Sequence, residues 1–246
     1  MTYDLNGKTA IVTGGSRGIG AAIAKRFAKE GAHVVLSYNS SEGPAKEVVS
    51  AIEAAGGSAE AVKADASDPN SASAYINAAK ARGGIDILVH NAGIVEMGPV
   101  GDMDLDAFRR VMGVNVDAVY AGTHAAAPHI VDGGSVIVIS SVNAHSMPMA
   151  GGSLYGASKA AASALARYWA RDLGPRGIRV NAIQPGPVDT DMNPADGPFG
   201  EALTRMTALG RYGRGEEIAA LAAFLASSEA SYITGAVIDI DGGMTV

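Results

Sequence analysis

The chain has 246 residues, a formal net charge of −6, no cysteine, and hydrophobic residues at 48% of its positions. This length and apolar content suit an α/β protein with a buried core and exclude wholesale disorder. An acidic chain without a Lys/Arg run is a poor partner for nucleic acid or membrane phosphates, and the lack of cysteine excludes disulfides and thiolate chemistry.

From the N-terminus, the first eight residues carry Asp4 and no apolar core, so we expect no signal peptide. No apolar stretch further along is long enough to cross a bilayer. Both observations predict a soluble, cytoplasmic protein.

Short apolar runs then alternate with helical patterns. Val136–Ile139 is continuously apolar, which is typical of a strand covered on both faces. Strand–helix alternation without a linker predicts one domain over residues 1–246. The expected fold is a Rossmann-type, doubly wound parallel sheet of about seven strands with helices on both faces. The predicted strands are Thr9–Val12, His33–Leu36, Ala59–Ala64, Ile85–Val89, Ser135–Ile139, Ile178–Ile183 and Ala236–Ile240.

Prolines indicate where some of the connecting segments begin. Pro44 predicts the start of a helix that ends near Gly56. Asp68 is a candidate N-cap, with Pro69 at the first position of the helix that follows. Residues 185–200 contain four prolines and predict a long loop, which we interpret as part of a substrate lid at about 187–210.

A glycine-rich turn follows the first strand. It has the sequence Thr13-Gly14-Gly15-Ser16-Arg17-Gly18-Ile19-Gly20. Gly14 permits a sharp exit from the strand, whereas Gly18 and Gly20 would let a pyrophosphate approach the free amides of a helix N-terminus. Such a turn can be only a tight loop, but its place between a strand and an amphipathic helix favours dinucleotide binding.

Tyr155 and Lys159 stand four residues apart in an Ala- and Ser-rich helical stretch, so both project from one face. A free tyrosine has a pKa of about 10, and a nearby ammonium is expected to lower that pKa. Ser141 follows the fifth strand, at the end where α/β sheets bind ligands. In an arbitrary sequence the pair would be an incidental surface Tyr and Lys; the serine favours an acid–base group.

Together these motifs resemble the short-chain dehydrogenase/reductase family over essentially the whole chain. The resemblance also rests on Asn91-Ala92-Gly93, Pro185-Gly186 and the closing Ile233-Thr234-Gly235 and Asp241-Gly242-Gly243. Each piece is weak alone, but their order and spacing are specific. The family implies nicotinamide-dependent reduction of a carbonyl, or oxidation of the matching alcohol.

The resemblance also implies four catalytic residues. Ser141 would hydrogen-bond the substrate oxygen, and Tyr155 would protonate it as hydride arrives from C4 of the nicotinamide. Lys159 would hold the nicotinamide ribose and bias Tyr155, and Asn115 would complete a water-linked proton path. Ser140 is expected to be structural.

The cofactor is expected to be NADP(H) in preference to NAD(H). NAD enzymes of this fold usually place an acid at the end of the second strand, but Leu36–Ser40 has none. Arg17 would meet a 2′-phosphate, a solvated charge being the alternative. Asp65 resembles the family's adenine-contacting Asp, with helix capping as the alternative. The residues expected to bind the cofactor are Gly14, Ser16, Arg17, Gly18, Ile19, Gly20, Tyr38, Asn39, Ser40, Asp65, Asn91, Ala92, Gly93, Tyr155, Lys159, Pro185, Gly186, Val188 and Thr190.

The substrate side is less defined. The interval between Ser141 and Tyr155 is one residue longer than the family implies. We expect the extra residue to lie within residues 143–149, which would line the substrate side. The predicted pocket residues are Asn143, His145, Met147 and Met192. His90 replaces a usual Asn and is expected to be structural; Gly215 replaces a usual Pro, which should cost a little stability. The histidines show no metal-ligand spacing, so we predict no catalytic metal.

Three functions share this framework. We favour an NADPH-dependent carbonyl reductase with a small-molecule ketone or alcohol as its substrate. A 3-oxoacyl-acyl-carrier-protein reductase would need a basic patch for its acidic carrier, to which Arg109, Arg110, Arg205, Arg211 and Arg214 would contribute. The chain also resembles a subgroup with a cyclic-di-GMP-binding member, but the intact catalytic set favours an enzyme. By resemblance we expect a homotetramer that pairs helices around Ala121–Ala127 and Ala157–Ala170.

Overall fold

The computed structural model describes residues 3–246, apart from the side chain of Pro69. Within them, seven strands form one sheet in the order β3-β2-β1-β4-β5-β6-β7, and every neighbouring pair is parallel. The strands are β1 (Thr9–Val12), β2 (His33–Tyr38), β3 (Ser58–Lys63), β4 (Ile85–His90), β5 (Ile130–Ile139), β6 (Arg179–Pro185) and β7 (Val237–Ile240).

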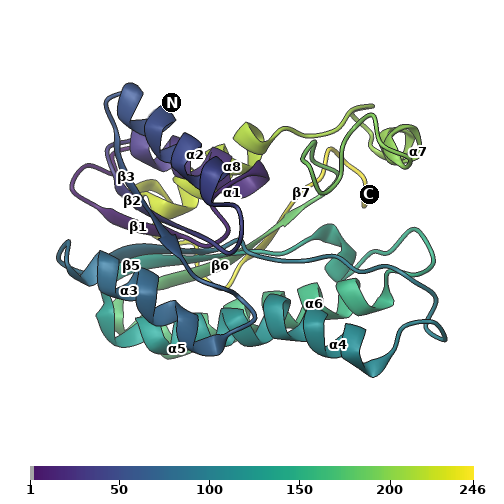
Figure 1. The fold of residues 1–246 in the computed structure, drawn as a ribbon, viewed down its shortest axis with the longest axis horizontal. Helices are drawn as coiled ribbons and strands as arrows, with labels where there is room; N and C mark the ends of the chain where they lie inside the picture. Colours follow the sequence, from purple (N-terminus) through teal and green to yellow (C-terminus); the bar gives the residue numbers. More distant parts are fainter. Residues whose placement is uncertain (1–2) are drawn as a thin grey trace.

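Helices cover both faces of the sheet, which confirms the predicted fold class (Figure 1). One face carries α1 (Gly18–Lys29), α2 (Glu42–Ala54) and α8 (Gly215–Ala226). The opposite face carries α3 (Ala72–Lys80), α4 (Leu105–Met112), α5 (Ala118–Ala126) and α6 (Ser153–Leu173). The remaining helix, α7 (Gly200–Met206), lies in the predicted lid. Short turns are η1 (Pro69–Ser71), η2 (Gly113–Asp117), η3 (Ala127–His129), η4 (Val142–Ala144), η5 (Gly174–Arg176) and η6 (Ser228–Ala230).

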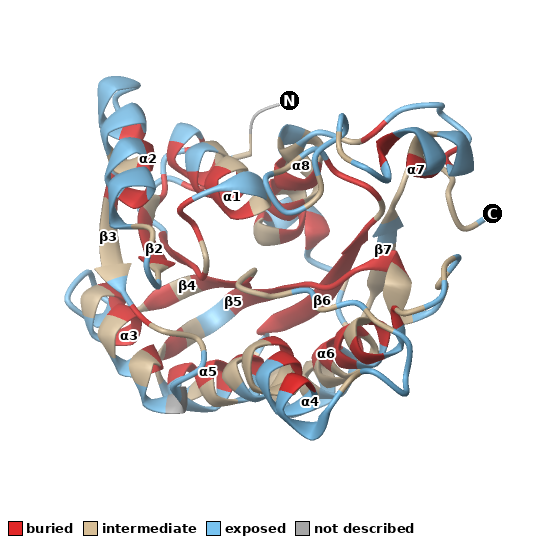
Figure 2. Cartoon of the chain, turned by 45° about the vertical axis from the view of Figure 1, so that its right-hand side comes forward, coloured by how far each residue is buried: buried red, intermediate tan, exposed pale blue. Residues whose placement is uncertain are grey.

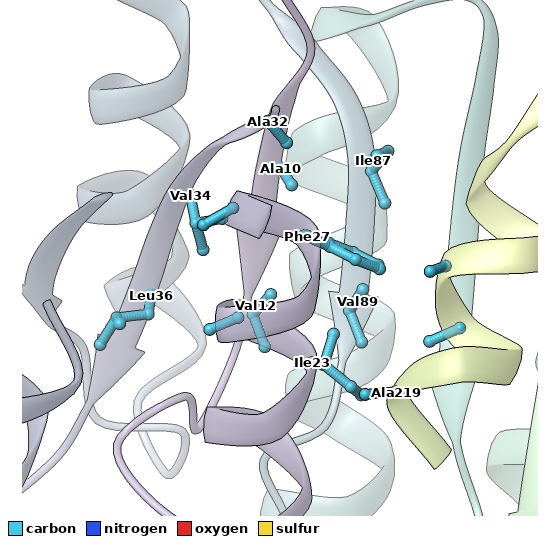
Figure 3. Packing of buried hydrophobic residues seen from close by; sticks show 14 of the residues in the cluster. Ala10, Val12, Ile23, Phe27, Ala32, Val34, Leu36, Ile87, Val89 and Ala219 are labelled. Atoms are coloured by element: carbon cyan, nitrogen blue, oxygen red, sulfur yellow. The ribbon is translucent and has the colours of Figure 1, made fainter. Parts of the chain in front are cut away.

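The side chains of α1 show why this helix lies on the sheet. Ile23 and Phe27, one helical turn apart, are fully buried and point toward Val12, Val89 and Ala219 (Figure 3). Burying a side chain as large as Phe27 contributes about 2–3 kcal/mol. Strand β6 and the second half of β5, Ser135–Ile139, are buried on both faces, as their apolar sequences predict (Figure 2).

Two helix starts differ from the sequence prediction. Helix α2 begins at Glu42, so Pro44 lies inside its first turn, where a missing N–H costs no helical hydrogen bond. Asp68 does act as a cap, because its Oδ1 accepts from the Asn70 amide at 2.9 Å. The element that it caps is the 3₁₀ turn η1, and α3 follows it.

The sheet places the loops that matter at one edge. Because all strands are parallel, the turns after β1, β2, β4, β5 and β6 leave from the same edge, and the strand order reverses between β1 and β4. Ligands of such folds bind outside the strand ends at this reversal. Within residues 3–246, no helix combines the length and apolarity needed to cross a membrane.

Candidate active site

The glycine turn joins β1 to α1 as predicted, but its glycines serve different purposes. Gly14 and Gly18 have φ values of 64° and 54°, in the left-handed region that glycine adopts without strain. A Cβ on Gly20 would lie 2.3 Å from the Gly14 carbonyl oxygen and 2.4 Å from Nδ2 of Asn91. Gly20 therefore lets the turn close on itself; it also lines the cleft, and its role in the approach of a pyrophosphate stays a prediction.

The turn is held by the loop after β4. Asn91 Nδ2 donates to the carbonyl oxygens of Thr13 and Gly14, at 2.9 and 3.0 Å. Thr13 Oγ1 accepts from the amides of Asn91 and Ala92, at 3.0 and 3.1 Å. The two motifs that the sequence presents 78 residues apart thus form one rigid unit at the point where the strand order reverses.

A cleft of about 350 Å³ runs from this unit along the strand ends. All the predicted cofactor residues line it except Pro185, Gly186 and Val188. A Cβ on Gly186 would lie 2.7 Å from Asp241 Cα, and Val188 is buried in a bridge to Gly213, so both support the base of the lid. Residues that line the cleft without having been predicted are Ser37, Ser41, Ala64, Ala66, Ile94, Val114, Ile139, Ser140 and Asp191.

The end of the cleft that is predicted to bind the adenosine lies beyond β2 and β3. Arg17 is exposed and lines the cleft together with Tyr38, Asn39 and Ser40. Asp65 also lines it, and its Oδ1 accepts from the amide and the hydroxyl of Ser67, both at 2.8 Å. These hydrogen bonds lower the pKa of Asp65. Asp65 thus caps the turn after β3 and not a helix, which differs from the helix-capping alternative, and it also faces the cleft.

Three side chains meet at the opposite end. Ser141 follows β5, and its hydroxyl hydrogen-bonds the Tyr155 hydroxyl while accepting from the Asn143 amide at 3.2 Å. Lys159, one turn after Tyr155 on α6, lies with Nζ 5.8 Å from the centroid of the Tyr155 ring. Lys159 Nζ also donates to the Ile139 carbonyl oxygen at 3.0 Å. The structure thus brings Ser141, Tyr155 and Lys159 together at the strand ends.

Burial dominates the protonation of this group. It raises the pKa of Tyr155, and the hydrogen bond from Ser141 opposes this rise only in part. Burial also lowers the pKa of Lys159 to about 8. The expectation that the nearby ammonium gives Tyr155 a lowered pKa is therefore wrong for this structure. At neutral pH the phenol keeps its proton and Lys159 is a cation.

The chain matches a known protein family in both sequence and fold. The family model described as enoyl-(acyl carrier protein) reductase matches residues 14–245. A short chain dehydrogenase from Burkholderia cenocepacia J2315, solved in complex with NADP, is 48% identical with a TM-score of 0.96, over 98% of this chain and 99% of that one. The chain belongs to the short-chain dehydrogenase/reductase family.

Relatives within the family have different functions. The Escherichia coli (strain K12) cyclic-di-GMP-binding biofilm dispersal mediator protein is 44% identical over 236 residues, 96% of each chain. 3beta-hydroxysteroid dehydrogenase 1 from Eggerthella lenta is also 44% identical, over 253 residues that cover 100% of this chain and 97% of that one. Overall identity therefore does not separate a nucleotide-binding mediator from a dehydrogenase.

Asn115, the fourth residue expected from the family, lies away from the cleft lining. It is buried in the π turn η2 between α4 and α5. Its Oδ1 accepts from the Ile94 amide, and its Nδ2 donates to the Ile94 carbonyl and to Ser158 Oγ, each at 2.9 Å. The side chain thus joins the loop after β4 to helix α6, and a role in a proton path remains a prediction.

Ser140 has the structural place that was expected for it. Its Oγ donates to the Lys159 carbonyl oxygen at 2.9 Å and accepts from Ser163 Oγ at 2.8 Å. Gln184 Nε2 donates in turn to Ser163 Oγ at 2.9 Å. This buried chain ties the ends of β5 and β6 to the helix turn that carries Lys159.

The predicted substrate pocket is only partly observed. Met192 lines the cleft, but Asn143, His145 and Met147 do not. His145 lies outside it, with Nε2 3.5 Å from a carboxylate oxygen of Asp239 on β7. The prediction of His145 as a pocket wall is therefore wrong, because the loop after Ser141 turns this side chain toward the sheet edge.

Two departures from the family pattern have structural explanations. His90 is buried with Nε2 2.8 Å from Thr123 Oγ1, and burial lowers its pKa to about 4, so it is a neutral structural residue as predicted. Gly215 begins α8, where a Cβ would lie 3.0 Å from the Ala22 Cβ of α1. The glycine permits this close helix contact, which offsets the stability cost expected from the missing proline.

Proposed function

We propose that the protein is an NADP(H)-dependent carbonyl reductase that converts a ketone to a secondary alcohol, and the alcohol back to the ketone. The observation that carries this proposal is the meeting of Ser141, Tyr155 and Lys159 at one end of a cleft whose other end is the glycine turn. A proton donor and a dinucleotide cradle thus share one site.

The cleft suits a nicotinamide dinucleotide. Gly18 begins α1, so the free amides and the positive end of the helix dipole face the cleft and suit a pyrophosphate. Arg17 and Ser40 suit a 2′-phosphate, and the first acid after β2, Glu42, is ion-paired with Lys46 at 2.7 Å. Bound there, the nicotinamide would supply the hydride.

The side chains at the other end would handle the proton. Ser141 accepts from the Asn143 amide, and its hydroxyl would exchange the hydrogen bond to Tyr155 for one to a substrate oxygen. Tyr155 would donate its proton to the same oxygen, and its raised pKa makes it a proton donor at neutral pH. Lys159, charged below its pKa of about 8, would stabilise the phenolate that remains. A protonated tyrosine supports the reductive direction.

Asn115 has a positioning role in this proposal. Its hydrogen bonds to Ile94 and Ser158 hold the loop after β4 against α6. Ser158 Oγ also donates to the Tyr155 carbonyl at 2.7 Å, so the network reaches the helix turn that carries the phenol.

Ion pairing weighs against an acyl-carrier-protein substrate. Each of the five arginines that would form the basic patch has a carboxylate partner, at distances from 2.7 to 3.9 Å. The partners of Arg109, Arg110, Arg205, Arg211 and Arg214 are Asp106, Glu96, Glu201, Glu217 and Glu217. An acidic carrier would therefore meet little unpaired positive charge.

The cyclic-di-GMP alternative is supported by one relative's function, and the preserved catalytic side chains favour the enzyme. The experiment incubates the purified protein with NADPH and a set of neutral ketones, and measures alcohol formed against NADPH consumed. We expect one alcohol per NADPH. Tight cyclic-di-GMP binding by calorimetry with no ketone turned over would contradict the proposal.

We also propose a homotetramer that packs through α5 and α6. Tyr120 on α5 and Tyr168 on α6 are exposed large side chains, and the Tyr120 ring lies 6.3 Å from that of Trp169 on α6. Aromatic rings beside small alanines suit close packing between helices. Sedimentation should show a tetramer that Tyr168→Glu dissociates; a wild-type monomer would contradict this.

A further inference from the structure

Three segments extend beyond the strand ends on the substrate side, and we call them the mouth loops. They are residues 94–104 after β4, 142–152 after β5, and 187–206 after β6, which includes α7. Figure 1 shows them at the same end of the molecule, on its right-hand side. Together they form about one-sixth of the chain but hold six of its nine methionines, namely Met97, Met103, Met147, Met149, Met192 and Met206.

Two of the mouth loops pack on each other beside the catalytic helix. The Gly98 amide donates to the Gly151 carbonyl at 2.9 Å. Met103 Sδ lies 2.8 Å from where a Cβ of Gly98 would be, and Met147 Cε lies 2.1 Å from the corresponding point on Gly152. Gly152 immediately precedes α6, which carries Tyr155. The Met147 thioether therefore packs against the start of the helix that carries the proposed proton donor.

Other methionines of the mouth loops are accessible to a ligand. Met192 lines the cleft and is 58% exposed, and Met97 and Met206 are 46% and 39% exposed. Phe199, just before α7, is also exposed. Methionine is flexible and polarisable, so a surface rich in it adapts to apolar molecules of different shapes.

The mouth loops carry an excess of negative charge, which disfavours the binding of anions. The three described segments contain seven carboxylate side chains and one arginine, and two of the carboxylates, Glu96 and Glu201, are ion-paired. That arginine, Arg205, is ion-paired with Glu201 at 2.7 Å, and Asp191 lines the cleft itself. A negatively charged substrate would approach through a negative potential and meet no unpaired cation of these loops.

We propose that the mouth loops select bulky, neutral, apolar ketones and discriminate against ketones that carry a carboxylate. This inference rests on the proposed function, whose hydride and proton transfer it leaves unchanged. The methionines would discriminate between ketones by size, and the carboxylates would discriminate between them by charge.

The charge prediction is tested with a matched pair of ketones. Para-methylacetophenone and para-acetylbenzoate share the same acetylphenyl group and differ only in the para substituent, and only the second is an anion. With NADPH, we expect kcat/KM at low salt to be at least about tenfold higher for the neutral ketone, and the ratio to shrink as salt screens the carboxylates. Equal values for the two ketones, or a ratio that salt does not change, would overturn the charge argument.

The size prediction is tested by Met192→Gln, which keeps the length of the side chain and makes it polar. We expect KM for para-methylacetophenone to rise about tenfold and KM for butanone to change little, because the small ketone has less apolar surface to lose. Met112→Gln, outside the mouth loops, is the control and should leave both KM values unchanged. Equal effects on the two ketones, or none, would contradict a role for Met192.

Binding separates this inference from the proposed function. Both aryl ketones are titrated by calorimetry into Tyr155→Phe loaded with NADPH, where proton transfer is blocked. Tighter binding of the neutral ketone with no turnover by the wild type would refute the reductase and leave the selectivity standing. Equal binding of the two ketones with normal turnover would refute the selectivity alone.

Discussion

The two ends of the cleft differ in what surrounds their glycines. At the cofactor end, a Cβ on Gly20 would lie 2.3 Å from the Gly14 carbonyl oxygen, which belongs to the backbone. At the mouth loops, a Cβ on Gly152 would lie 2.1 Å from Met147 Cε, the far end of a flexible side chain. Similar overlaps therefore have different consequences, because backbone cannot move aside and a methionine can.

In the proposed function, this difference would let one fold combine a fixed cofactor site with a variable substrate site. The glycine turn is bonded to the Asn91 loop through side-chain–backbone hydrogen bonds, so neither segment can change alone. Two of the mouth loops are joined by the Gly98–Gly151 hydrogen bond, and Met103 and Met147 each pack within their own loop. Substitutions there can alter substrate choice while leaving the cradle intact.

The largest expected effect comes from the two glycines themselves. Gly20→Ala should lower the free energy of unfolding by about 3 kcal/mol or more, despite the better helix propensity of alanine, because the overlap is with backbone. Gly152, whose φ is −93°, has a backbone conformation open to alanine, so Gly152→Ala should cost less than about 1 kcal/mol. Urea unfolding of both variants measures this, and equal losses would remove the distinction between the two ends.

Lys159 belongs to the group of side chains opposite the glycine turn, and its burial predicts a pH dependence of stability. Its pKa is about 8 in the fold and 10.5 for a free side chain. The unfolded chain therefore binds more protons between these values, so the free energy of unfolding rises with pH across this window. Relative to Lys159→Met, the wild type should gain about 3 kcal/mol over that range.

The measurement is urea unfolding of both proteins at pH 8 and pH 10.5, the limits of this window. Lys25→Met, at an exposed position on α1, is the control and should follow the wild type. If Lys159→Met also runs parallel to the wild type, the lysine is not buried as a destabilising cation.

A smaller effect is expected at the adenosine end. Arg17→Ala should weaken NADPH binding by about tenfold and leave NADH binding unchanged, because only NADPH carries the 2′-phosphate. Lys25→Ala removes a cation from an exposed position of the same helix and should change neither affinity. Calorimetric titration with both nucleotides tests this. If Arg17→Ala weakens the binding of NADPH and NADH equally, the arginine does not contact the 2′-phosphate.

The sequence allowed more of the cofactor end to be predicted than of the substrate end. Thr13, Gly14 and Asn91 belong to short motifs that residue type and spacing reveal, although the hydrogen bonds that join them link residues 77 to 79 positions apart. His145 was misplaced because its direction depends on Asp239 of β7, nearly a hundred residues away. No local pattern carries that information.

Smaller differences between the predicted and the observed structure also have physical reasons. Strand β5 begins at Ile130, earlier than predicted. Its first half contains an aspartate and two glycines, which apolar patterning does not mark as strand. Ile139 and Val114 line the cleft but carry no chemical signal. Only their positions reveal them: Ile139 ends β5, and Val114 lies in the turn between α4 and α5.

The central claim is that Tyr155 gives its proton to the substrate oxygen. The most direct measurement is single-turnover reduction of a neutral ketone by NADPH-saturated wild type and Tyr155→Phe, with NADPH affinity measured on both. The account predicts a rate at least about a hundredfold lower for the variant, at unchanged NADPH affinity. A variant that reduces the ketone at the wild-type rate would show that another group supplies the proton.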